Sequence, residues 1–191
     1  MTGDDLGGTL LAIARTAIAQ SLGLRAAANA NHPALSRPAA TFVTLKQRGE
    51  LRGCIGTLEA FRPLALDVHQ NAVGAAFRDP RFRPLAAEEF AQTSVEVSLL
   101  SHSEPLDVAD EHDLLPLLRP GQDGLTLAFG RHRATFLPQV WDQLAEPREF
   151  LGALKRKAGL PADFTSPRIR YSRYAVTQWA ETDPVTAGAR A

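Results

Sequence analysis

Apolar and polar residues alternate along this chain with two periods, one helical and one extended. Between residues 10 and 22 the apolar residues recur at helical spacing, which predicts a helix that Gly23 ends. From Thr93 to Leu100 every second residue is apolar, which predicts a strand with one buried and one polar face. The same reasoning predicts helices over 62–78, 86–90, 110–118, 138–144 and 148–157, and strands over 41–45, 51–58 and 169–178.

Short turns join the predicted strands into antiparallel pairs. Strands 41–45 and 51–58 are linked by KQRGE, where Gly49 can adopt the positive φ that a hairpin turn requires, and we expect Leu51 and Ile55 to face the core. A second hairpin spans 124–137 and turns at Gly130. Antiparallel hairpins with flanking helices favour an α+β fold over a doubly wound parallel sheet.

Composition and charge exclude several classes of protein. The 191 residues are 45% hydrophobic, which is typical of a globular chain, and one domain is the default at this length. The 21 basic and 21 acidic residues cancel, which argues against a general polyanion binder. Asp4 and Asp5 stand where a signal peptide needs positive charge, and the apolar run 9–24 is too short and too polar to span a membrane. We therefore expect a cytoplasmic protein without membrane contact. No feature of the pattern predicts an oligomeric state.

The chain's single cysteine, Cys54, lies in the predicted strand 51–58, between Gly53 and Gly56. Alternate residues of a strand share a face, so Arg52 is expected to bring its guanidinium close to the thiol. A nearby cation favours the thiolate, which makes Cys54 a candidate nucleophile, with Arg52 and the two glycines as candidate binding residues. Glycines inside a strand indicate a bulge or the close approach of a ligand or another backbone. The alternative is that Cys54 is a small buried side chain without chemistry.

Two further positions carry candidate chemistry. Asp79 and Arg81 lie in the proline-bounded loop DPRFRP, where they are candidate binding residues; alternatively, Asp79 accepts backbone amides and is structural. Glu96 lies on the polar face of strand 93–100. It is an acid/base candidate if that face lines the same site as Cys54, and an ordinary surface glutamate if it does not.

Metal and cofactor motifs are missing from the sequence. One cysteine builds neither an internal disulfide nor a cysteine zinc site, the five histidines show no metal-ligand spacing, and no phosphate-binding glycine loop occurs, so we expect no metal and no cofactor. RNA is a candidate partner, since arginines alternate with tyrosines near the end of the chain. The residues concerned are Arg168, Arg170, Tyr171, Arg173 and Tyr174, with a second basic group at 155–157. The alternative is a solvated helix end followed by a half-buried strand.

The stretch FVTLKQRGELRGCIGTLE, residues 42–59, resembles the signature of the AMMECR domain family. The resemblance continues through the DPRF loop and the VEVSLLS strand, and further matching segments are 121–130, 136–140, 150–151, 157–160 and 179–181. It covers about residues 8–182, which would form the family's domain, followed by a flexible tail over 183–191. One departure is Asp123, where a histidine or similar residue is expected.

The resemblance implies an α+β fold with a larger and a smaller lobe around a cleft that bears the LRGCIG motif. It also implies a relation to protein A of the AmmeMemoRadiSam system, whose other members, a Memo-like protein and a radical SAM protein, become candidate partners. It supplies no reaction. Three functions therefore stay open: a ligand-binding or catalytic protein that works at 52–56 in a modification pathway, a non-catalytic adaptor, and an RNA-binding accessory protein.

Overall fold

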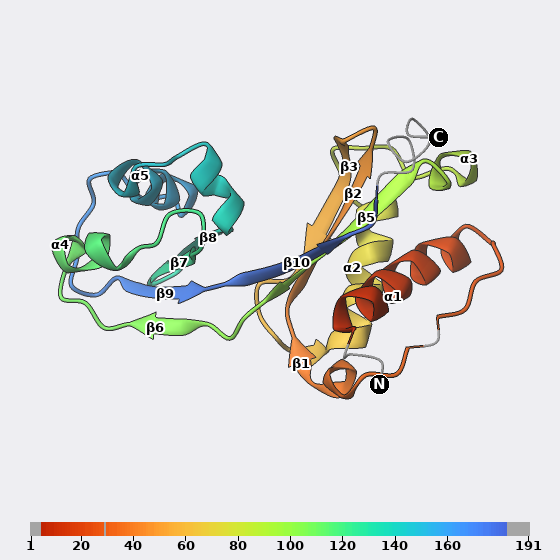
Figure 1. The fold of residues 1–191 in the computed structure, drawn as a ribbon. Coiled ribbons are helices and arrows are strands. Elements are labelled where there is room, and N and C mark those ends of the chain that lie inside the picture. Colours follow the sequence, from red (N-terminus) through yellow and green to blue (C-terminus); the bar gives the residue numbers. More distant parts are fainter. Residues whose placement is uncertain (1–4, 29, 183–191) are drawn as a thin grey trace. The chain divides into compact units, whose positions relative to one another are not determined.

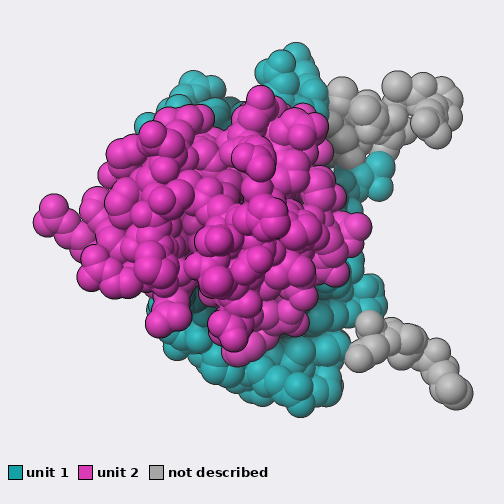
Figure 2. Space-filling model, turned by 90° about the vertical axis from the view of Figure 1, so that its left-hand side faces the viewer, with its two compact units in different colours: residues 1–100, 177–191 teal, residues 101–176 magenta. Residues whose placement is uncertain are grey.

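The computed structural model describes residues 5–28 and 30–182 of the chain (Figure 1). The chain divides into two compact units, coloured separately in Figure 2. The larger, unit 1, comprises Met1–Leu100 and Thr177–Ala191, and the smaller, unit 2, comprises Ser101–Val176. Each unit combines helices with a four-stranded sheet and has its own hydrophobic core. The predicted α+β fold is confirmed. The predicted domain 8–182 spans both units, and the predicted tail at 183–191 lies outside the described residues.

Unit 1 is a sheet with two helices packed on one face. The strand order is β10-β5-β2-β3, and its elements are α1 (Leu6–Ser21), β2 (Thr41–Gln47), β3 (Glu50–Gly56), α2 (Leu64–Phe77), β5 (Thr93–Leu100) and β10 (Val176–Ala180). Shorter elements are η1 (Pro33–Ser36), β1 (Pro38–Ala39), β4 (Arg62–Pro63) and α3 (Ala87–Phe90). The core forms where α1 and α2 meet the inner faces of β2 and β5.

The helix boundaries of unit 1 follow local backbone chemistry. The Asp5 side chain accepts a hydrogen bond from the Gly8 N–H at 2.8 Å and so caps the start of α1, while Gly23 adopts φ +75° just beyond its end. The second helix was predicted from Arg62 but begins at Leu64. Arg62 and Pro63 instead pair with β1, and Pro63 directly precedes the first helical residue.

A bulge in β3 changes which residues face the core. Leu45 pairs with Gly53, yet the next residue, Lys46, pairs with Leu51, so Arg52 is an extra residue on β3. One extra residue moves the following side chains to the opposite face of a strand. Leu51 is consequently 42% exposed, and the prediction that it faces the core is wrong.

The other half of the hairpin prediction is confirmed. Thr41–Gln47 and Glu50–Gly56 pair antiparallel, and Ile55, opposite the fully buried Val43, packs against the core of unit 1. Ile55 lies beyond the bulge, where the alternation of faces is undisturbed. The bulge therefore separates an exposed, irregular half of β3 from the half that carries Cys54.

Unit 2 contains the second sheet, with strand order β6-β9-β7-β8. Its elements are β6 (Glu104–Leu106), α4 (Glu111–Leu114), η2 (Leu115–Leu117), β7 (Gly124–Phe129), β8 (His132–Phe136), η3 (Pro138–Asp142), α5 (Pro147–Lys157) and β9 (Arg170–Tyr174). The predicted hairpin turn is confirmed at Gly130, where φ is +56°. The Trp141 and Phe150 rings stack at 3.7 Å between centroids inside the core. Asp123, fully buried, accepts hydrogen bonds from Arg119.

The strand predicted over 169–178 is in fact two strands that belong to different sheets. β9 pairs with β6 and β7 in unit 2, whereas β10 lies beside β5 in unit 1. Ala175 separates them, and its N–H and C=O bond with the Ser101 hydroxyl and the Ser101 N–H at 2.9 and 2.8 Å. The stretch 169–178 contains neither glycine nor proline, so no turn residue marked the boundary between the two strands.

Candidate functional site

The Cys54 thiol lies on the face of the unit 1 sheet that the helices do not cover. Cys54 pairs with Thr44 on β2, and Thr44 pairs in turn with Glu96 on β5, so the three side chains form a row across the sheet. Val43 and Leu45, which flank Thr44, are fully buried on the opposite face. The thiol is half-buried, and its sulfur accepts a hydrogen bond from the Thr44 hydroxyl at 3.4 Å.

The DPRF loop covers the sheet edge at Cys54. β3 is the last strand in the order β10-β5-β2-β3, so the Cys54 N–H and C=O that point outward have no neighbouring strand. Asp79 Oδ2 accepts the hydrogen bond of this N–H at 2.8 Å, and Arg81 Nη2 donates to the Cys54 carbonyl at 3.4 Å. Asp79, only 4% exposed, thus accepts a backbone amide, as one of the two predictions for it stated.

Asp79 and Arg81 also bind each other and fix a charge beside the thiol. Arg81 donates from Nη2 and Nε to the two carboxylate oxygens at 2.7 and 3.0 Å. These hydrogen bonds, against the opposing effect of burial, hold the pKa of Asp79 well below its usual range. The pKa of Arg81 is raised, chiefly by its hydrogen bond to Asp79 and to a smaller extent by the nearby Cys54. The Arg81 side chain remains 55% exposed, so a permanently charged guanidinium is presented at the surface next to Cys54.

Arg52 binds Glu89 and the loop before α3, and not the thiol as predicted. Its guanidinium pairs with Glu89 at 3.1 Å and donates to the Arg83 carbonyl at 3.0 Å. The pKa of Glu89 is lowered to about 2 because the Ala86 N–H and then Arg52 donate hydrogen bonds to it. The expected approach of Arg52 to the thiol is therefore wrong, because the bulge turns Arg52 out of alternation with Cys54. The cation beside Cys54 is Arg81.

The glycines of the motif allow close packing. A Cβ on Gly53 would lie 2.1 Å from the Ala75 carbonyl oxygen of α2, so only glycine lets this helix approach β3 so closely. A Cβ on Gly56 would lie 2.2 Å from the Phe42 ring. The predicted close approach of another backbone is confirmed at Gly53, and packing by itself accounts for both glycines.

Glu96 lies on the same sheet face as Cys54, which was the condition for its acid/base role. Its carboxylate pairs with Lys46 at 2.8 Å, and its side chain is 12% exposed. Thr44 stands between Glu96 and Cys54 in the row. The role of Glu96 stays a prediction, as does the nucleophilic role of Cys54.

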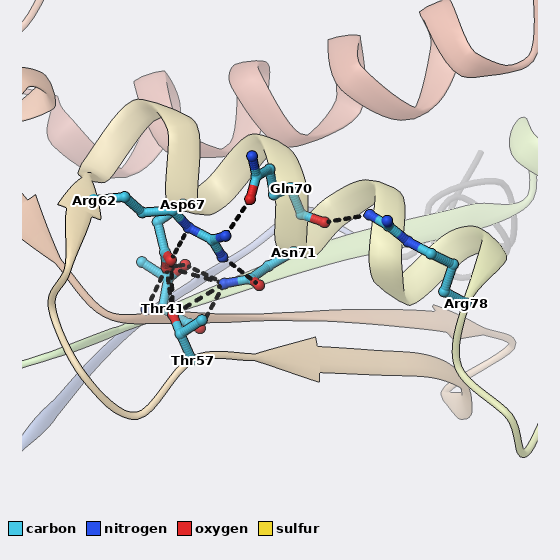
Figure 3. A network of polar contacts seen from close by, with 7 residues as sticks. All are labelled: Thr41, Thr57, Arg62, Asp67, Gln70, Asn71 and Arg78. Atoms are coloured by element: carbon cyan, nitrogen blue, oxygen red, sulfur yellow. Dashed lines mark hydrogen bonds and ion pairs between the residues drawn. The ribbon is translucent and has the colours of Figure 1, made fainter.

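A buried polar network that the sequence reasoning missed lies at the start of α2 (Figure 3). The Asp67 carboxylate is fully buried and accepts hydrogen bonds from the Thr41 N–H at 2.8 Å, from Arg62 Nε at 2.7 Å and from the Thr57 hydroxyl at 2.7 Å. Asn71 donates to the same carboxylate at 2.9 Å. The spacing of residues in α2 could have predicted it, because Asp67 and Asn71 lie beside the apolar stripe of this helix and therefore face inward.

The residues proposed to stack on RNA are not arranged for it. Tyr171 and Tyr174 are 4% and 5% exposed, so their rings lie in the core of unit 2 and offer no face to a base. Arg173 pairs with Glu104 at 3.3 Å, and the Arg168 guanidinium lies 5.4 Å from the centre of the Phe129 ring. Stacking on the two tyrosines is therefore excluded in this structure, while RNA binding through the exposed arginines stays a prediction.

Metal-ligand types gather at one exposed place in unit 2. Asp110, His112 and Asp113 bring candidate ligand atoms within 4.8 Å of one another. One Asp110 oxygen already accepts hydrogen bonds from the His112 and Asp113 backbone amides at 2.8 and 3.1 Å, which caps α4. The arrangement is explained as a helix cap. Separately, no helix within residues 5–28 and 30–182 is long and apolar enough to cross a membrane.

Fold and site together define a two-unit α+β protein in which the sheet of the larger unit carries a half-buried thiol on its edge strand, beside a loop with a paired aspartate and arginine. The model of the AMMECR1 family matches residues 11–179. The chain belongs to this family, as the resemblance of its LRGCIG and DPRF segments predicted.

Relatives from several archaea cover nearly the whole chain. A protein of Methanothermobacter thermautotrophicus is 42% identical over 179 residues, which is 89% of this chain and 91% of the relative. A protein of Saccharolobus islandicus is 36% identical and covers 95% of this chain and 84% of its own length. The crystal structure of the uncharacterised protein PH0010 from Pyrococcus horikoshii matches with a TM-score of 0.82 and 30% identity, over 95% of this chain and 94% of that one. The family and the fold are thus shown.

Proposed function

We propose that this protein binds a small acidic molecule on the polar sheet face beside Cys54, with Arg81 holding its anionic group and the thiol in contact with its other end. The observation that carries this proposal is the way Asp79 divides its hydrogen bonds. One buried carboxylate fixes both the Cys54 backbone, at 2.8 Å, and the Arg81 side chain, at 2.7 Å, while that side chain stays 55% exposed. A cation and a thiol are thereby held at a set distance with the outer edge of the guanidinium left for a ligand.

The arrangement suits recognition of an oxyanion. Guanidinium groups donate charge-assisted hydrogen bonds to carboxylates and phosphates. Asp79 and the Cys54 carbonyl take the bonds of Nε and Nη2 of Arg81, and Nη1 is the nitrogen that can donate to a ligand. The charge of Arg81 is permanent, because its pKa is raised above its already high ordinary value. A ligand held there would place its remaining atoms along the row Cys54, Thr44, Glu96.

In the catalytic form of the proposal, Cys54 is the nucleophile of a modification reaction. The hydroxyl of Thr44 donates to its sulfur at 3.4 Å, and the Arg81 guanidinium lies next to the residue. In this form the thiol adds to an electron-poor carbon–carbon double bond of the bound molecule: the sulfur–carbon bond forms as the π bond breaks, the thiol gives up its proton and the neighbouring carbon gains one, with Glu96 as the candidate acid/base on the same face.

Alkylation of the folded protein tests the proposal directly, because the chain has one cysteine. Iodoacetate is anionic and iodoacetamide is neutral, while both attack the same sulfur. Relative to a free cysteine at equal pH, we expect the protein to prefer iodoacetate by about fivefold, the equivalent of about 1 kcal/mol for an exposed ion pair. Arg81→Gln should abolish the preference.

Arg83→Gln is the matched control, since this arginine lies two residues away and its side chain is 81% exposed. It should leave the iodoacetate preference unchanged. A folded protein whose thiol ignores both reagents, or whose preference is the same with and without Arg81, would contradict the proposal.

A second candidate function, that of a non-catalytic adaptor, is supported by apolar side chains at the surface of unit 1. Leu58, Phe61 and Leu66 are 50%, 68% and 44% exposed and lie in one short stretch of chain. The resemblance to protein A of the AmmeMemoRadiSam system offers a Memo-like protein and a radical SAM protein as partners. Under this proposal, Phe61→Asp abolishes co-purification with them and Cys54→Ala does not; the reverse pattern favours the thiol site.

A further inference from the structure

Unit 2 contains a pocket beside α5 that no part of the proposed thiol site uses. Its volume is about 320 Å³, which is within the range of small-molecule sites. Its lining comes from α5, from α4 and η2, and from the residues that follow α5; Figure 1 labels α4 and α5. Leu115 and Leu151 supply apolar wall. The charged groups on the lining are Glu111, Arg148, Lys155 and Asp163.

A glycine in the middle of α5, Gly152, forms part of the pocket wall. Glycine inside a helix is destabilising relative to alanine, so a helical glycine needs a physical reason. A Cβ on Gly152 would have its nearest contact beyond the helix backbone at the Ala162 Cβ, at the ordinary distance of 3.6 Å. Ala162 also lines the pocket, so the methyl group of an alanine at 152 would occupy pocket space without a clash.

The other helical glycines show the contrast. Within residues 5–28 and 30–182, three more glycines lie inside α-helices: Gly7, Gly8 and Gly74. A Cβ on each of them would lie 2.2, 2.2 and 3.0 Å from a neighbouring side chain, so close packing explains all three. Packing does not explain Gly152. A helix position left open on the wall of a pocket is what the close approach of a ligand to the backbone requires.

A buried lysine joins three of the lining segments. Lys155, on α5, is 1% exposed; its ammonium group pairs with the Glu111 carboxylate of α4 and donates to the Ala162 carbonyl at 3.1 Å. Ala162 belongs to the residues that follow α5. The lysine–glutamate pair therefore fixes the walls of the pocket and adds no net charge to it.

The remaining charges on the lining are of opposite sign and both exposed. Arg148 and Asp163 line the pocket, and within the described parts of the chain neither side chain takes part in a hydrogen bond or an ion pair, including one between the two. A second guanidinium stands close by, since Arg156 Nη1 lies 3.9 Å from the position of a Cβ on Gly152. Charges of both signs next to apolar wall match a molecule that carries both signs itself.

We infer that this pocket is a binding site for a free amino acid with an apolar side chain. Arg148 holds the carboxylate beside Gly152, Asp163 holds the ammonium group, and the apolar side chain packs against Leu115 and Leu151. The site is independent of the thiol and of the proposed function in unit 1.

Three probes of similar shape test this assignment: phenylalanine, phenylalaninamide, which lacks the carboxylate, and phenylpropanoate, which lacks the ammonium group. Labelling the 14 glycines with nitrogen-15 gives few NMR signals, and the Gly152 amide is the signal that is missing from the spectrum of Gly152→Ala. We expect phenylalanine to shift the Gly152 signal saturably. Each analogue should bind about fivefold more weakly, the effect of one lost exposed ion pair.

Variants of the two exposed charges assign a role to each. Arg148→Gln should weaken phenylalanine binding about fivefold and no longer distinguish it from phenylalaninamide. Asp163→Asn should weaken it equally and no longer distinguish it from phenylpropanoate. Arg131→Gln and Asp142→Asn are the matched controls, because these residues are exposed in unit 2 and do not line the pocket; both should bind phenylalanine as the wild type does.

Two variants of Gly152 separate stability from binding. Gly152→Ala should raise the midpoint of thermal unfolding, since alanine favours the helix and meets no clash. Gly152→Leu should fill the pocket and abolish phenylalanine binding in ligand-observed NMR. The assignment is overturned if millimolar phenylalanine, leucine and methionine all leave the Gly152 signal unmoved, or if either analogue binds as well as phenylalanine. A lower midpoint for Gly152→Ala, or wild-type binding by Arg148→Gln and Asp163→Asn, would overturn it equally.

Discussion

Two buried carboxylates of unit 1, Asp67 and Asp79, solve the same physical problem in different ways. Each lies away from water, each accepts backbone and side-chain hydrogen bonds, and each is paired with an arginine at 2.7 Å. Around Asp67 the network closes on itself, since the Arg62 side chain that completes it is only 16% exposed. Around Asp79 the network opens outward, because the side chain of Arg81 is 55% exposed.

The two carboxylates therefore have different roles: Asp67 joins parts of the fold, and Asp79 holds an arginine at the surface. Asp67 ties the start of α2 to β2 and to the residue after β3, and all of its partners are internal (Figure 3). Asp79 uses its buried position to hold a charged group at the surface and the backbone of the only cysteine beside it. A buried carboxylate with only internal partners fixes the elements that it joins. A buried carboxylate with an exposed partner fixes the position of a group that a ligand can reach.

Removing the two carboxylates should have unequal effects on stability. Asp67→Ala should lower the free energy of unfolding by about 4 kcal/mol, because it leaves a buried arginine and several buried donors unpaired. Asp79→Ala should cost about 2 kcal/mol, since Arg81 can turn to water and mainly the Cys54 amide is left unpaired. Urea unfolding of both variants measures this difference, and equal losses would contradict the division between a closed and an open network.

Glycine at 53 lets α2, which carries Asp67, pack against β3, which carries Cys54. Gly53→Ala should destabilise the protein by about 3 kcal/mol, because the new methyl group meets a helix carbonyl that cannot move by itself. Gly56→Ala meets the Phe42 side chain at the base of its ring, which moves only if the whole side chain changes its χ1 angle, so it should cost less than a clash with backbone, about 2 kcal/mol. Thermal unfolding of the pair tests the order, and a Gly56→Ala effect as large as that of Gly53→Ala would show that the ring is equally fixed.

Replacing the arginines that pair with these carboxylates, Arg62 and Arg81, should also give unequal but smaller losses of stability. Arg62→Gln should lower the free energy of unfolding by about 2 kcal/mol, since Asp67 is then buried without its cation. Arg81→Gln should cost about 1 kcal/mol at most, because backbone N–H groups of Cys54 and Arg81 still donate to Asp79. Chemical denaturation gives both values. If Arg81 proves the more important of the two for stability, its main role is structural and the anion site loses its support.

Acid should destabilise unit 1 through two carboxyl groups whose pKa values are lowered, Glu89, which pairs with Arg52, and Asp79, which pairs with Arg81. The folded-state pKa of Glu89 is about 2, below its ordinary value of 4.5, so its stabilisation is present above about pH 4.5 and is lost as the pH falls towards 2. Asp79, whose pKa is also lowered, acts in the same direction. Glu89→Gln should therefore reduce the fall in unfolding free energy between pH 4.5 and 2. The exposed neighbour Glu88 provides the control, and Glu88→Gln should leave that fall unchanged.

The pattern of apolar residues anticipated most of the elements but not their partners. β5 was predicted over its full range, Thr93–Leu100, because an alternating strand is a local property of eight consecutive side chains. The strand over 169–178 was predicted as one, because the pattern records faces and not the sheet that a strand joins. The prediction that Leu51 faces the core failed for a related reason. A bulge shifts the alternation by one residue, and nothing in the residue types of Leu51 and Arg52 indicates a bulge there.

Sequence by itself determined the family, the α+β class and the positions of Cys54, Asp79 and Arg81 as candidate residues, since these depend on local pattern and on residue type. Only the tertiary structure decided which arginine lies beside the thiol. Arg52 is two residues away along the strand yet is turned to Glu89 by the bulge, whereas Arg81, far away in the sequence, is brought to Cys54 by a buried carboxylate. Charges act through space and over short distances, so their partners are set by how the chain packs and not by their separation along it.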